Sequence, residues 1–84
     1  MTDHEWNIDE KQMEARRTIG AILSLRVRPR FHRFPEIVFC ATVENAVLTT
    51  LHSADDCLTM DVAMADADRA ARAILIAALD LVPA

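Results

Sequence analysis

The sequence has few of the residues that mark common functional classes. It contains one glycine, which cannot build a glycine-rich phosphate loop. Its two cysteines, Cys40 and Cys57, are too few for a disulfide scaffold and lack CxxC spacing. No HExxH motif and no serine-centred nucleophile elbow are present. We therefore predict a protein without catalytic activity, cofactor or bound metal.

Long hydrophobic runs are also missing. The run from Ala73 to Leu79 falls far short of the ~20 residues that a bilayer-spanning helix needs. The N-terminal stretch MTDHEWNIDE is acidic and polar, whereas a signal peptide begins with basic residues and continues with apolar ones. These features predict a soluble, cytoplasmic protein with no membrane contact. For the two cysteines of such a protein, two buried free thiols are the default and a single disulfide bridge is the alternative.

The composition is that of one ordered domain. The chain has 84 residues, of which 52% are hydrophobic and 26% are charged. We expect residues 1–6 to form a flexible tail, with Trp6 as its anchor, and residues 7–84 to form a single small globular domain.

Charge is distributed unevenly along the chain, although the net charge is only −4. Residues 1–34 hold seven basic and five acidic residues, a formal +2, whereas residues 35–84 hold two basic and eight acidic residues, a formal −6. Such asymmetry is compatible with intramolecular pairing, with self-association and with an acidic partner.

Helical periodicity is strongest near the C-terminus. Asp66 and Asp68 suit the first turn of a helix, so we predict a helix from Asp66 to Val82. Most of its circumference is apolar, and such a helix must be covered on more than one side by a sheet, another helix or a second copy of the chain. A homodimer formed through this helix is therefore one expected association.

The N-terminal part also carries helix signals. The residues Asn7 to Glu10 resemble an N-cap followed by a capping-box acid, and Gly20 stands where a helix could end. We predict a helix from Asn7 to about Ile19. Its apolar side is thin, so it would need to dock on a sheet.

Alternation of polar and apolar residues indicates strands in the middle of the chain. Residues 21–31 predict an edge strand because Pro29 interrupts the alternating pattern, and Cys57 to Met64 predict a further strand. Residues 36–53 leave two interpretations open. They form either a hairpin about Glu44 and Asn45, which the β-branched residues favour, or one helix.

Together these elements predict an α+β two-layer sandwich with an N-terminal helix, three to four antiparallel strands and an apolar C-terminal helix. An all-α three-helix bundle is the alternative.

The stretch RVRPRFHRF, residues 26–34, is the most unusual local feature. In an extended chain its alternate side chains would project to one side, which suits contact with carboxylates or phosphates. Three interpretations stay open: an edge strand protected by charge and proline, a surface for an acidic protein partner, or a nucleic-acid surface. The predicted partner-binding residues are Arg26, Arg28, Arg30, Phe31 and Arg33.

The stretch HSADDC, residues 52–57, is the only cluster of metal-ligand residue types. His52 and Cys57 could hold Zn²⁺ or form a thiol nucleophile, but a tight turn explains the two aspartates between them. We predict a small protein-binding or regulatory module that self-associates. The alternatives are a nucleic-acid-binding accessory protein that uses residues 26–34, and a small metal- or thiol-dependent enzyme at His52 and Cys57.

Overall fold

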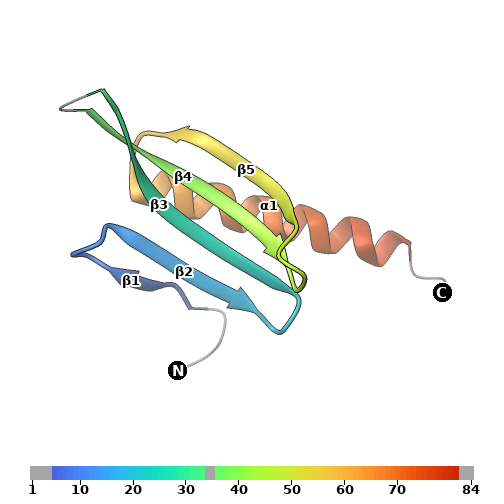
Figure 1. The fold of residues 1–84 in the computed structure, drawn as a ribbon. Helices are drawn as coiled ribbons and strands as arrows, with labels where there is room; N and C mark the ends of the chain where they lie inside the picture. The colour runs from blue at the N-terminus through green and yellow to red at the C-terminus, as the bar shows by residue number, and fades with distance from the viewer. Residues whose placement is uncertain (1–4, 34–35, 82–84) are drawn as a thin grey trace.

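The computed structural model describes residues 5–33 and 36–81, with the backbone alone at 31–33 and 36. Five strands form one antiparallel sheet in the order in which they occur along the chain, and one long helix follows them (Figure 1). The elements are β1 (Asn7–Asp9), β2 (Glu14–Ile19), β3 (Leu23–Arg33), β4 (Glu36–Asn45), β5 (Thr50–Cys57) and α1 (Met60–Asp80).

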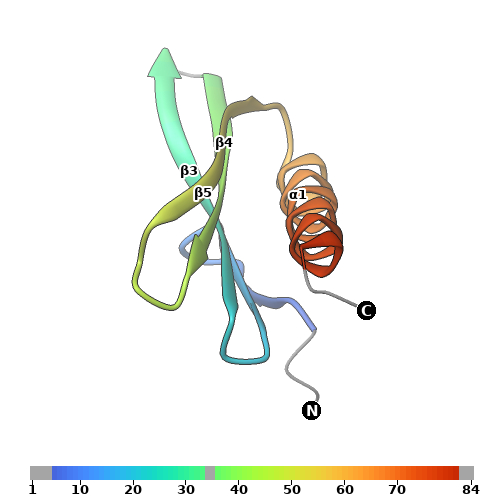
Figure 2. The same ribbon diagram turned by 90° about the vertical axis from the view of Figure 1, so that its right-hand side faces the viewer.

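The helix α1 covers one face of the sheet, and the other face has no covering layer in the described structure (Figure 2). Successive strand residues point to opposite faces, so alternate residues of β3 meet the helix. The buried residues at this interface are Ala15, Leu23, Leu25, Val27, Ala41, Val43, Cys57, Ala63, Ala67, Ala70 and Ala71. All four of the buried helix residues are alanines, which let the helix backbone lie close to the sheet.

Short polar side chains and left-handed backbone positions shape the turns. The Asp9 carboxylate accepts hydrogen bonds from the backbone N–H groups of Lys11 and Gln12, at 3.1 and 3.2 Å. The Asn45 side chain does the same for Val47 and Thr49, at 3.1 and 2.9 Å. Such side-chain bonds to nearby backbone groups stabilise tight turns and hence the hairpins.

The predicted N-terminal helix is wrong, because residues 7–19 form the β1–β2 hairpin. Asp9, which the sequence predicts at the start of a helix, is the last residue of β1, and its carboxylate stabilises the turn that follows. β2 then pairs with β3, and Ala15 is fully buried opposite Val27. Pairing with the neighbouring strand outweighs weak local helix signals, since a thin apolar side cannot hold a helix.

The predicted strand from Cys57 to Met64 is also wrong, because α1 begins at Met60. Thr59 is its N-cap, and the Thr59 hydroxyl accepts the backbone N–H of Val62 at 3.1 Å. The alternation in this segment was too short to distinguish a strand from the first two turns of a helix.

Residues 36–53 follow the hairpin interpretation, with a turn at 46–49 rather than about Glu44 and Asn45. The architecture is thus α+β with five strands and one helix, and the three-helix bundle is excluded. β3 is the central strand, not an edge strand. Its pairing with β2 stops at Val27, so Pro29 lies where β3 has only β4 as a neighbour.

Candidate functional site

The uncovered face of the sheet carries a row of arginines from β3. Leu25 and Val27 are fully buried beneath α1, so Arg26, Arg28 and Arg30 project from the opposite face. Arg28 and Arg30 are exposed, and Arg26 is partly buried among its neighbours. This placement follows the alternation that the sequence predicts for these three residues.

A fourth arginine joins them from β2. Arg16 is the register partner of Arg26, so the two side chains lie directly opposite each other on the same face. Like charges in this position destabilise a sheet. Arg16 is not among the predicted contact residues, because the sequence predicts a helix for residues 7–19. We call Arg16, Arg26, Arg28 and Arg30 the arginine face.

Two carboxylates on the same side of the sheet partly balance this charge. Glu14 lies 3.4 Å from the guanidinium of Arg26, and Asp55 lies 3.5 Å from that of Arg30. Among the described side chains, Arg16 and Arg28 have no ion-pair partner. The arginine face therefore combines two paired guanidinium groups with two that remain available to an anionic partner.

The other two predicted contact residues, Phe31 and Arg33, belong to the far end of β3, where the pairing with β4 shifts by one residue. Their side chains lie outside the described part of the structure, as does all of Phe34. Phe39, in β4, packs against the core beneath α1. No described aromatic side chain therefore accompanies the arginine face as a base-stacking platform.

The His52 and Cys57 side chains of β5 have different surroundings. His52 lies 2.7 Å from the Asp66 carboxylate in α1, and the Arg69 guanidinium binds the other oxygen of that carboxylate. Burial alone would raise the pKa of Asp66, but the hydrogen bonds from His52 and Arg69, with their charges, hold the pKa below its ordinary value. These contacts tie β5 to the helix.

Cys57 belongs to the core and is 7% exposed. Burial and then the nearby Asp66 carboxylate raise the pKa of the Cys57 thiol, which keeps it protonated and weakly nucleophilic. Cys40 and Cys57 are both free thiols. Within residues 5–30 and 37–81, no group of three potential metal-ligating side chains comes together.

A second polar cluster lies on the opposite flank of α1. Asp68 accepts a hydrogen bond from the indole N–H of Trp6 at 3.0 Å and another from Arg17. Trp6, which the sequence predicts as the anchor of the N-terminal tail, is held to α1 by this bond, whereas residues 1–4 of that tail lie outside the described residues. Beside it lies an open cleft of about 450 Å³, with Ile19 and Leu75 among its apolar lining.

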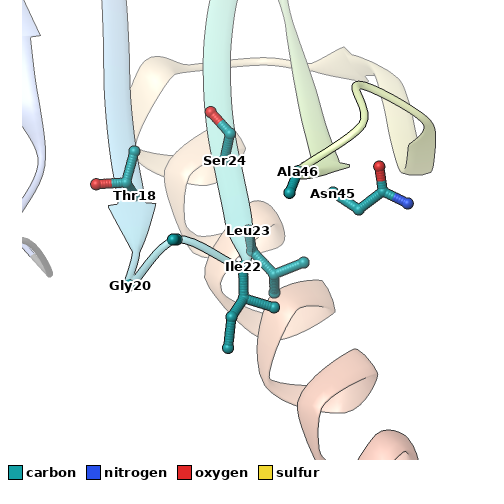
Figure 3. Close-up of a pocket in the computed structure, with 8 residues that line it drawn as sticks. Thr18, Gly20, Ile22, Leu23, Ser24, Asn45 and Ala46 are labelled. Atoms are coloured by element: carbon teal, nitrogen blue, oxygen red, sulfur yellow. The ribbon is translucent and has the colours of Figure 1, made fainter.

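A smaller hollow of about 140 Å³ lies at the end of the sheet, around the β2–β3 turn and the end of β4 (Figure 3). Gly20, in this turn, has a φ of +56°, a backbone conformation that glycine adopts at little cost. Thr18 and Ser24, which are register partners, supply its hydroxyl groups. The hollow is too small for most ligands of drug size.

Comparison with known proteins gives no family assignment. No model of a known family matches the sequence, and no curated protein or solved structure is significantly similar to it. In the described part of the chain, no helix is long and apolar enough to cross a membrane.

Proposed function

We propose that this protein is a non-catalytic binding module that self-associates and holds an acidic protein partner on its arginine face. The observation that carries the proposal is the direct cross-strand pairing of Arg16 with Arg26, with Arg28 beside them on an uncovered sheet face. Unfavourable like-charge contacts become favourable when carboxylates of a partner lie between the guanidinium groups.

A cytoplasmic location belongs to the same proposal. Cys40 and Cys57 are free thiols, which suits a reducing compartment.

A nucleic-acid-binding accessory protein is the second candidate, because guanidinium groups bind phosphate as well as carboxylate. It receives less support, since the chain carries a net charge of −4 and the described arginine face has no stacking aromatic residue.

Two fluorescent probes of equal length, a glutamate-rich peptide and a single-stranded oligonucleotide, would test the proposal by anisotropy at physiological salt. We expect the wild-type protein to bind the peptide in preference to the oligonucleotide. Arg28→Glu should lower peptide affinity by about tenfold, since one favourable contact becomes repulsive. Lys11→Glu makes the same charge change at an exposed turn and serves as the control.

Preference for the oligonucleotide, with an affinity that falls steeply as salt rises, would favour the second candidate. Equal peptide binding by both variants and the wild type would refute the arginine face as the contact surface.

A further inference from the structure

The outward face of the C-terminal part of α1 has no cover from the rest of the described chain, whereas Ile74 and Leu75 on its inward side pack against the core. Its last buried residue is Ala71, and beyond it Ile76, Leu79 and Leu81 are 51%, 69% and 85% exposed. Figure 1 shows this part of the helix reaching past the end of the sheet. The helix nevertheless continues past Leu75 to Asp80, although most helical stability in proteins comes from packing of an apolar face.

The exposed side of this segment carries one basic and one acidic residue with an apolar residue between them. Arg72, Ile76 and Asp80 are spaced by four residues and therefore lie in one row along the helix. All three are exposed, with the apolar side chain midway between the two opposite charges. Arg72 and Asp80 are separated by about 12 Å along the helix axis. Ala73 and Leu79 flank the row and are also exposed.

This arrangement is complementary to itself. From this arrangement of Arg72, Ile76 and Asp80 we infer that two copies of the chain pair through antiparallel α1 segments, about a two-fold axis located at Ile76. In this orientation Arg72 of each copy faces Asp80 of the other, and the two Ile76 side chains meet at the axis. A parallel pair would instead place like charges together, and antiparallel packing also sets the helix dipoles in opposite directions. Ala73 and Ala77 allow the helices to approach closely.

The size of the surface sets the expected strength of the pair. Stable interfaces bury about 800 Å² per partner, which is about one eighth of the 6244 Å² surface of this chain. One helix face with two large apolar side chains, Ile76 and Leu79, falls below that. Val47 and Leu48 lie in a turn that bends away from α1 in Figure 2. We therefore expect a reversible dimer whose population depends on concentration.

The inference rests on the self-association part of the proposed function and is independent of the arginine face. Sedimentation velocity over a concentration series would test it with three variants. Arg72→Asp and Asp80→Arg each create two like-charge contacts across the axis, so each should raise the dimer dissociation constant by roughly tenfold. The double variant Arg72→Asp/Asp80→Arg restores opposite charges and should return the constant to near the wild-type value.

A cross-link would test the position of the axis. Ile76→Cys should form a disulfide between copies under mild oxidation, because a residue at the two-fold axis meets itself. Ala65→Cys, exposed on the same helix but closer to its N-terminus, should not. A wild-type chain that sediments as a monomer throughout, or a dimer that the single charge changes leave intact, would overturn the proposal. Neither result would alter the peptide-binding test of Arg28→Glu.

Discussion

Asp68 is the residue whose loss should be most informative about how the N-terminal hairpin is held. Its two carboxylate oxygens bind the Trp6 indole and the Arg17 guanidinium, which joins the segment before β1, the strand β2 and the helix α1. Asp68→Ala removes both contacts. It also leaves Arg17, whose side chain is 21% exposed, without this counter-charge, while its Nε is already buried without a partner.

The magnitude follows from the environment of the carboxylate. A hydrogen bond to a charged group contributes about 1.5–3 kcal/mol. The Asp68 side chain is 37% exposed, so solvent screening reduces the ion pair with Arg17 to about 1 kcal/mol or less. We expect a total loss of about 2 kcal/mol in unfolding free energy, which for a domain of this size lowers Tm by about 10 °C.

Urea unfolding followed by tryptophan fluorescence and by circular dichroism would measure this loss. Trp6 is the only tryptophan, so a red-shifted emission of the folded variant would report release of its indole directly. Glu10→Gln, an exposed change in the same hairpin, is the control and should leave both signals unchanged. An Asp68→Ala protein within about 0.5 kcal/mol of the wild type, with unchanged emission, would refute this account of the N-terminal contact.

Three further predictions concern the packing of α1, its contact with β5 and the two thiols. Ala67→Leu should lower the unfolding free energy by about 2 kcal/mol in urea, because it overfills the fully buried interface, whereas Ala65→Leu on the exposed side should be nearly neutral. The pKa of Asp66 in the folded protein lies below its ordinary value of 3.8. The ionised carboxylate therefore stabilises the folded state above pH 3.8, and this stabilisation is lost as the pH falls through the folded pKa. Acid titration of Asp66→Asn should accordingly show lower stability at neutral pH and a weaker loss in acid; an unchanged profile would contradict this contact. Alkylation followed by mass spectrometry should modify half-buried Cys40 before Cys57, and the reverse order would contradict the raised thiol pKa.

The sequence could predict those elements whose pattern is local. The C-terminal part of α1 and the alternating residues Leu23, Leu25 and Val27 have strong periodicity, and both formed as expected. The hairpin interpretation of residues 36–53 was favoured by β-branched residues, which suit a pleated surface.

The remaining elements depend on contacts between distant residues. β2 has little apolar pattern of its own, because Arg17 faces α1 and is paired there with Asp68, 51 residues away. No local signal reveals that partner, so the segment was assigned to a helix. The wrong helix prediction is also why Arg16 was not predicted in the contact surface, since its position opposite Arg26 follows only from strand register.

Affinity capture with matched charge changes tests most directly whether the arginine face holds an acidic protein partner. Tagged wild-type protein, Arg28→Glu and Lys11→Glu would be used on nuclease-treated and untreated halves of a native lysate, with the retained proteins quantified by mass spectrometry. We predict acidic proteins that bind the wild type and Lys11→Glu but are lost with Arg28→Glu. Retention of the same proteins by all three, or capture that disappears after nuclease treatment, would contradict the claim.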